Sequence, residues 1–182
     1  ANPGPPVSKL EIMRSSAIVL HGPPGAGKSS IASSLQDSAP VPAFHVTLDA
    51  FVTMSRRRDM RSPEEQRLAY RLHCENLRST LCRLVDTDFE IILDTVLRDE
   101  AGFQACLDAL SARPLYMVGV RAPLITLEQR ESNRKDRAMG MAREQHGHTV
   151  FVRPYDVVLD TSSCTPDEGA AAIRDFIGSA PR

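Results

Sequence analysis

The sequence predicts a three-layer α/β/α fold built on a five-stranded parallel sheet. Three observations support this prediction. Short apolar runs alternate with amphipathic stretches along the chain, as expected for a parallel sheet covered by helices on both faces. A Gly-x-x-x-x-Gly-Lys-Ser phosphate loop at residues 22–29 directly follows the first apolar run. Two later runs end on Asp49 and Asp94, at the sheet edge where such folds bind ligands. The fold class is therefore that of the P-loop NTPases.

The expected elements follow from these patterns in chain order. Leu77, Leu81 and Leu84, with Tyr70 and Cys74 before them, form one apolar stripe of a long helix that Ser62 caps. Strands are expected at 16–20, 44–48, 90–93, 115–120 and 155–159. Helices are expected at 29–35, 63–85 and 98–112, after Pro123, and after the cap Thr165.

The composition is that of one ordinary globular domain. The chain has 182 residues, of which 42% are hydrophobic and 25% charged. We expect residues 14–182 to form a single domain, with a lid at about 130–145. Residues 1–13 lack periodicity, and we expect a disordered leader or a segment foreign to the native protein.

Charge and hydropathy exclude several partners. With 22 Lys and Arg against 23 Asp and Glu, the net charge of -1 gives no bulk attraction for nucleic acid. No apolar run reaches the ~18 residues that span a membrane. The four cysteines lack C-x-x-C spacing, and three occupy apolar helix positions, which indicates reduced core thiols in a cytoplasmic protein without a zinc site.

The phosphate loop identifies the nucleotide side of a site. Its small residues let consecutive backbone N–H groups turn toward phosphate oxygens, and the following helix adds its positive N-terminus. Lys28 is expected to reach the β- and γ-phosphates, and Ser29 to ligate Mg²⁺. The expected nucleotide-binding residues are Gly22, Gly25, Ala26, Gly27, Lys28, Ser29, Ser30, Arg130 and Arg134.

Two strand-end acids are the candidates for the remaining chemistry. Phosphoryl transfer needs Mg²⁺ and a carboxylate within reach of the attacking hydroxyl. Asp94 is placed to orient Mg²⁺ together with Ser29, whereas Asp49 is placed to hold the acceptor. The alternative for either acid is an N-cap of the next helix.

A charged stretch at 130–140 follows the fourth strand, where small kinases fold a lid over the nucleotide. Arg134 and Arg137 are expected to contact the polyphosphate as catalytic residues, alongside Lys28 and Asp49. The alternative is a solvated helix face. Selection of the base is expected to depend on residues 161–164, although no base-reading motif is legible there.

These motifs together resemble the chloramphenicol phosphotransferase-like proteins. The resemblance rests on the phosphate loop and on residues 48–50, 118–121, 134–142 and 155–161. It implies an ATP-dependent kinase with a nucleoside-monophosphate-kinase-like fold, which phosphorylates a hydroxyl of a small antibiotic. It also implies that Asp49 is the base and that the lid arginines grip phosphates. One departure is that Asp94 is followed by Thr95 where the family pattern leads us to expect a second acid.

The region after Asp49 does not resemble a pocket for a neutral nitroaromatic amide. Guanidinium groups favour planar anions and phosphates. This segment carries many of them, at positions 56, 57, 58, 61, 67, 71, 78 and 83. We expect the acceptor to contact Asp49, Phe51, Arg56, Arg57 and Arg98, and part of the arginine cluster to be a solvated face.

Three functional hypotheses remain open. The first, and leading, hypothesis is an ATP- and Mg²⁺-dependent O-phosphotransferase acting on a small hydroxylated molecule, with an antibiotic as the expected acceptor. The second keeps the kinase but changes the acceptor to a nucleoside, sugar or other anionic metabolite. The third is a nucleotide-binding switch with little catalysis. The sequence leaves a homo-oligomer open.

Overall fold

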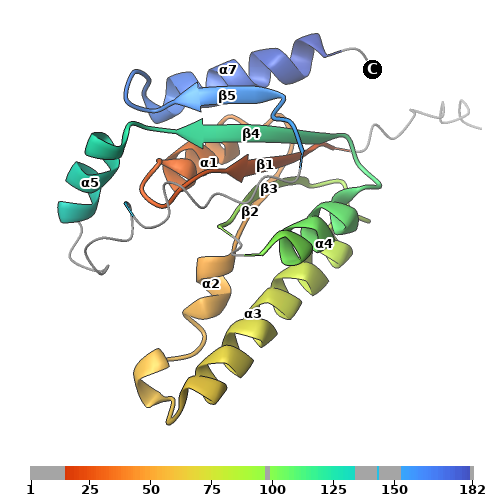
Figure 1. Cartoon of the computed structure of the whole chain (residues 1–182). Coiled ribbons are helices and arrows are strands. Elements are labelled where there is room, and N and C mark those ends of the chain that lie inside the picture. Colours follow the sequence, from red (N-terminus) through yellow and green to blue (C-terminus); the bar gives the residue numbers. More distant parts are fainter. Residues whose placement is uncertain (1–14, 97–98, 134–142, 144–152, 181–182) are drawn as a thin grey trace, which may run out of the picture.

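The computed structural model describes residues 15–96, 99–133, 143 and 153–180. It confirms the three-layer α/β/α architecture with a five-stranded parallel sheet (Figure 1). The strand order is β2-β3-β1-β4-β5, so the strand that enters the phosphate loop is central. The elements are β1 Ala17–His21, α1 Lys28–Asp37, β2 Ala43–Thr47, α2 Leu48–Val52, η1 Arg57–Asp59, α3 Pro63–Leu84, β3 Glu90–Asp94, α4 Glu100–Leu110, β4 Leu115–Arg121, α5 Leu124–Ser132, β5 Val157–Asp160 and α7 Pro166–Ser179.

Two apolar clusters cover the two faces of the sheet. Alternating side chains of β1 and β3 point to opposite faces, and all residues of both strands are buried. One cluster joins the sheet to α3 and α4 through Leu77, Leu81 and Phe103, among others. The other joins it to α1, α5 and α7, with Ile31 and Ile173 as members. Helices therefore cover both faces of the central strands. This explains why the sequences of β1 and β3 are continuous apolar runs.

The second strand ends earlier than predicted. Thr47 rather than Leu48 is its last residue, because the Thr47 side chain accepts a hydrogen bond from the backbone N–H of Asp49 and starts α2. Asp49 therefore lies in the first turn of a helix and does not end a strand. The fifth strand begins at Val157, two residues later than predicted, and the helix predicted from residue 98 begins at Glu100.

The chain leaves the sheet after β2 and forms a helical arm, residues 48–72, which extends away from the sheet (Figure 1). Ser62 caps α3 by accepting from the backbone N–H of Glu65, as predicted. Of the predicted α3 stripe, the three leucines are buried, whereas Tyr70, in the arm, and Cys74, just beyond it, are only partly buried. Cys82 is exposed, so the expectation of a core thiol is wrong there; Cys106 is buried.

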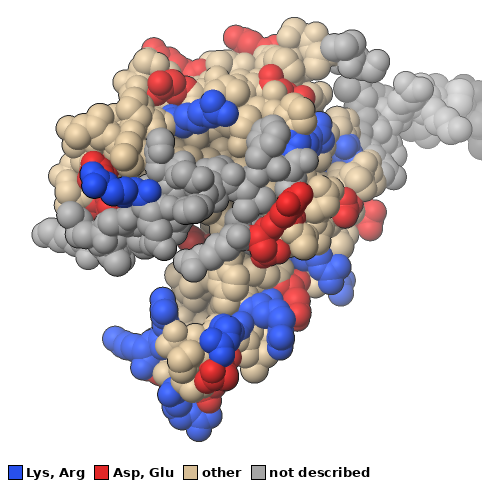
Figure 2. Space-filling view, viewed as in Figure 1, with Lys and Arg blue, Asp and Glu red and all other residues tan. Residues whose placement is uncertain are grey.

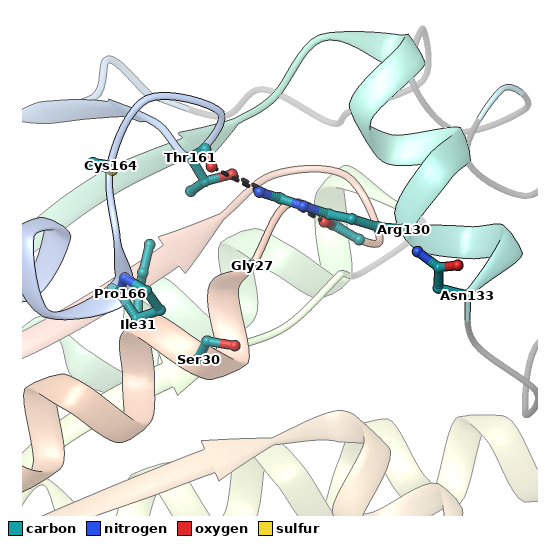
Figure 3. Close-up of a pocket in the computed structure, with 9 residues that line it drawn as sticks. Gly27, Ser30, Ile31, Arg130, Asn133, Thr161, Cys164 and Pro166 are labelled. Carbon is teal, nitrogen blue, oxygen red and sulfur yellow. Dashed lines mark hydrogen bonds between the residues drawn. The ribbon is translucent and has the colours of Figure 1, made fainter.

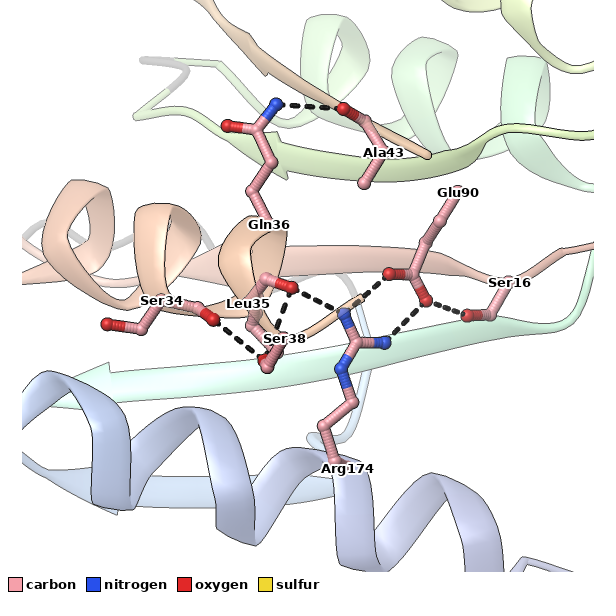
Figure 4. A network of polar contacts seen from close by, with 8 residues as sticks. All are labelled: Ser16, Ser34, Leu35, Gln36, Ser38, Ala43, Glu90 and Arg174. Atoms are coloured by element: carbon pink, nitrogen blue, oxygen red, sulfur yellow. Dashed lines mark hydrogen bonds and ion pairs between the residues drawn. The ribbon is translucent and has the colours of Figure 1, made fainter. Parts of the chain in front are cut away.

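A buried ion pair ties α7 to the sheet (Figure 4). The guanidinium of Arg174 donates to both carboxylate oxygens of Glu90 at 2.7 Å and to the carbonyl oxygen of Leu35 at 2.6 Å. Ser16 donates to the same carboxylate at 2.7 Å. Glu90 is the first residue of β3, so this network lies at the amino ends of the strands. The phosphate loop lies at their carboxyl ends.

The structure also tests the expectation about membranes. Within the described residues, no helix has both the length and the apolar character needed to cross a bilayer.

Candidate active site

Close backbone packing shapes the phosphate loop. A Cβ on Gly22 would lie 2.0 Å from the carbonyl oxygen of Val120 in β4, so only glycine fits there. Gly27 has φ 92° and is the N-cap of α1, a conformation that side-chain-bearing residues rarely adopt. The loop thus makes a tight turn that leads directly into α1. The partial positive charge at the N-terminus of this helix favours anions.

Lys28 is held inside this loop. Its side chain is 6% exposed, and Nζ donates to the carbonyl oxygens of Gly22 and Pro23, each at 3.0 Å. A buried ammonium beside a helix N-terminus is a strong attractor for phosphate oxygens. The position agrees with the role expected for Lys28 from the motif.

Ser29 and Asp94 meet beside the loop. Ser29 Oγ donates to Asp94 Oδ2 at 2.6 Å, and Asp94 is paired in register with Leu20 of β1 on one side and Thr47 of β2 on the other. Burial opposes ionisation of Asp94, but contacts with His45, Lys28 and Ser29 outweigh it and hold its pKa below the usual value. A hard divalent cation prefers such hydroxyl and carboxylate oxygens.

Ser29 and Asp94 offer oxygen ligands of the kind that Mg²⁺ takes. Among the described residues, no group of three or more His, Cys, Asp or Glu side chains is placed to hold a metal by itself. Mg²⁺ is commonly held by one or two carboxylates together with substrate phosphates and water. Ser29 and Asp94 would hold the cation here, which would neutralise charge on the transferring phosphoryl group.

Asp49 lies on a short helix rather than at the end of a strand. It is exposed, in the first turn of α2, and β3 stands between its strand and β1. Thr47 caps α2 and Asp99 caps α4, so neither Asp49 nor Asp94 is an N-cap. The α2 helix begins directly beyond the residue that pairs with Asp94, which puts both acids at the same edge of the sheet.

A pocket of about 380 Å³ adjoins the loop (Figure 3). Arg130 of α5 crosses it and donates to Gly25 O at 3.2 Å, Thr161 Oγ1 at 2.8 Å and Thr161 O at 2.7 Å. Thr161 in turn donates to Ala26 O at 2.8 Å. The pocket is lined by Gly25, Gly27, Ser30, Ile31, Arg130, Asn133, Thr161, Cys164 and Pro166. It includes two residues of the segment where base selection was expected.

Sequence reasoning missed two histidines. His21, the last residue of β1, is 3% exposed and stacks on Phe103 with ring centroids 4.6 Å apart. Its Nδ1 lies 2.7 Å from the hydroxyl of Tyr155. Burial, with help from the charge of Lys28, lowers the His21 pKa to about 4. His45 on β2 lies 3.6 Å from Asp94. Neither residue belongs to a local motif, so no signal short of the strand order could have found them.

The expected acceptor residues divide into two groups. Phe51 is half-buried at the base of the helical arm. Arg56 and Arg57 are exposed farther out, where Lys and Arg side chains gather (Figure 2). Arg56 pairs with Asp59 at 2.7 Å, and Arg57 donates to Gln66 at 3.1 Å. Arg98, Arg134 and Arg137 lie outside the described residues.

The central parallel sheet, the phosphate loop and the acid beside its serine define a P-loop kinase fold. A candidate kinase from Chloroflexus aurantiacus has a TM-score of 0.70 at 15% identity, over 93% of this chain and 99% of that one. The Mycobacterium tuberculosis APS kinase CysC, solved with AMPPNP and APS, has a TM-score of 0.65 at 16% identity, over 91% and 99%. The tunicamycin resistance protein of Deinococcus radiodurans has a TM-score of 0.65 at 18% identity, over 93% and 100%.

The family follows from a separate comparison. The family model described as chloramphenicol phosphotransferase-like protein matches residues 15–178, and the chain belongs to that family. This confirms the resemblance drawn from the motifs. A comparison with curated proteins found no match. Family and fold together support an ATP-dependent kinase.

Proposed function

We propose that this protein is an ATP- and Mg²⁺-dependent O-phosphotransferase that phosphorylates a hydroxyl of a small molecule. The observation that carries the proposal is the meeting of Lys28, Ser29 and Asp94 at one sheet edge, with the 2.6 Å contact between Ser29 and Asp94 at its centre. ATP as donor also fits a cytoplasmic protein.

The nucleotide side is supported by the pocket and the loop. The base would lie in the pocket crossed by Arg130, and the phosphates would extend toward Lys28 at the start of α1. Ser29 and Asp94 would hold Mg²⁺, which supplies charge neutralisation when bound. Arg134 and Arg137 would add positive charge from the lid segment during transfer.

The acceptor side is supported by the position of Asp49. Its carboxylate is exposed at the start of the helical arm, at the same edge as Asp94. A carboxylate at this position would take the proton of an acceptor hydroxyl as the phosphoryl group transfers. Phe51 would contribute an apolar surface and Arg56, Arg57 and Arg98 positive charge to the acceptor.

The leading acceptor class is a hydroxylated antibiotic, in keeping with the family description and with the tunicamycin resistance protein of the same fold. The second class is an anionic hydroxylated metabolite. The arginines of the arm favour it, as does the fold shared with the enzyme solved with APS. The two classes differ in what the arm must recognise.

A transfer assay separates these classes. Purified protein is incubated with Mg²⁺ and γ-labelled ATP against a panel of hydroxylated antibiotics and a panel of nucleosides, sugars and anionic metabolites, and products are identified by mass. We expect a compound from one panel to yield a product about 80 Da heavier than the compound itself, because transfer of one phosphoryl group replaces H by PO₃H₂. No product from either panel, together with nucleotide-dependent capture of a protein partner, would favour the switch hypothesis instead.

The role of Asp49 is tested by Asp49→Asn, which keeps the size of the side chain. We expect transfer to fall by roughly 10²–10⁴-fold with the affinity for MgADP nearly unchanged. Asp86→Asn, an exposed acid after α3, is the matched control and should behave as wild type. An unchanged transfer rate in Asp49→Asn contradicts the assignment of the base.

A further inference from the structure

A histidine faces the acid that is proposed to hold the metal. His45 Nε2 lies 3.6 Å from Asp94 Oδ2, with side-chain exposures of 18% and 5%. His45 is paired in register with Ile92, and Thr47 with Asp94, so His45 and Asp94 project from the same face of two neighbouring strands. The carboxylate therefore has the Ser29 hydroxyl and the His45 imidazole as neighbours.

The second observation concerns the hydrogen bonding of the His45 imidazole. His45 Nε2 is buried, and within the described part of the chain it has no hydrogen-bond partner at ordinary distance. A buried N–H without a partner loses its hydrogen bonds to water, whereas an apolar side chain at the same strand position would carry no such penalty. A small rotation of either side chain closes 3.6 Å to a charge-assisted hydrogen bond.

We propose that His45 is a positioning residue, whose Nε2–H orients the Asp94 carboxylate for a divalent cation bound with the nucleotide. This inference rests on the proposed function, since Asp94 must be a metal-site residue for its orientation to matter. Partners that orient a metal-ligating carboxylate change metal affinity by roughly 10–100-fold when removed.

The position of His45 also links the two halves of the site. Two residues beyond His45, the side chain of Thr47 caps α2, and Asp49 follows in the first turn of that helix. A contact that holds His45 against Asp94 therefore also fixes the strand end from which α2 starts. The same short strand serves the metal position and the proposed base.

The test measures binding of ADP by titration calorimetry, with Mg²⁺ and with EDTA, so that the strengthening by Mg²⁺ is obtained without catalysis. In His45→Leu we expect that strengthening to fall about 10-fold or more, while metal-free ADP binding changes by less than about 2-fold. His45→Gln retains an N–H donor and should recover most of the effect. Phe44→Leu, at the exposed neighbouring position of β2, is the matched control and should match wild type.

Each outcome is decisive. If wild type binds ADP no better with Mg²⁺ than with EDTA, both the proposed metal site and the role of His45 fail. If wild type shows the strengthening and His45→Leu keeps it, only the role of His45 fails. The role also fails if Phe44→Leu loses the strengthening equally, or if His45→Leu weakens metal-free binding as much as metal-dependent binding, because general damage to β2 then explains the result.

Discussion

The hydroxyl of Tyr155 lies 2.7 Å from Nδ1 of His21, although the two residues are 134 positions apart. His21 is the residue directly before Gly22, and Tyr155 precedes β5. The Arg121 guanidinium stands 5.6 Å from the centroid of the Tyr155 ring. His21, which leads into the phosphate loop, is thus packed by Phe103 of α4 and by Tyr155, and Arg121 of β4 in turn lies against the Tyr155 ring.

Gly119→Ala should disturb the packing of Tyr155 and lower the stability of the protein. A Cβ at Gly119 in β4 would lie 2.9 Å from two ring atoms of Tyr155, so the ring must move away from His21. Because overpacking a tight contact costs about 1–3 kcal/mol, we expect a loss of that size in the free energy of unfolding, measured with urea. Gly178→Ala in α7 is the control: nothing lies within 4 Å of its added Cβ, and the change should be neutral or stabilising. Equal stabilities of the two variants would show that the Tyr155 contact is unimportant.

The buried His21 should make stability depend on pH. Its pKa is about 4 in the folded protein against an ordinary value of 6.5, so below pH 6.5 the unfolded chain takes up the proton more readily. His21 therefore contributes fully above pH 6.5, and its contribution of at most about 3 kcal/mol is lost as the pH falls from there toward 4. Urea unfolding between pH 7.5 and 4.5, compared with His21→Asn, isolates this share. Parallel curves for the two proteins would contradict it.

Arg130 should matter for nucleotide affinity more than a surface arginine that does not line the pocket. Arg130→Ala removes three hydrogen bonds to Gly25 and Thr161 and with them the guanidinium that crosses the pocket. We expect MgADP binding to weaken by roughly 10–100-fold, as measured by calorimetry, since hydrogen bonds to charged groups contribute about 1.5–3 kcal/mol. Arg67→Ala, which removes an exposed ion pair with Glu64 on α3, should leave binding unchanged. An equal effect of both substitutions would remove Arg130 from the pocket's function.

Arg113 should be important for stability alone. It is 5% exposed, and its guanidinium donates to the carbonyl oxygens of Val85 at 2.9 Å and Leu84 at 2.7 Å, where α3 ends. Arg113→Met removes a buried charged donor from both carbonyls, although the Leu84 carbonyl still accepts from Thr87, and we expect a loss of about 2–4 kcal/mol in urea unfolding. Arg83→Met, exposed in the last turn of α3, should change stability by less than about 0.5 kcal/mol. A small effect at Arg113 would mean that water replaces it readily.

The predictable part of the fold was the part encoded locally. β1 and β3 are buried on both faces, so their sequences are continuous apolar runs, and Ser62 and Thr165 mark helix starts by capping that depends on residues three positions on. Asp49 was misplaced because Leu48 continues the apolar pattern of β2. The Thr47 side chain, which ends the strand, gives no signal in a hydrophobicity pattern.

Two parts of the site could be predicted from the sequence: the phosphate loop and the contact between Ser29 and Asp94. The phosphate loop is contiguous, and Ser29 and Asp94 could be brought together by the rule that strand ends share an edge. His21, His45 and Arg113 contact partners at least 24 positions away, and such pairings follow from how the elements pack rather than from spacing along the chain. The roles of Asp49, Arg98, Arg134 and Arg137 stay predictions.

The strand order separates the helical arm from the phosphate loop. Because β3 stands between β2 and β1, the helical arm departs from a strand that does not touch the strand of the phosphate loop. Four exposed apolar side chains of the arm, Val52, Met54, Leu68 and Leu72, belong to neither core cluster among the described residues. Under the proposed function, substitutions at these positions should therefore alter what the arm recognises while the nucleotide half keeps its structure.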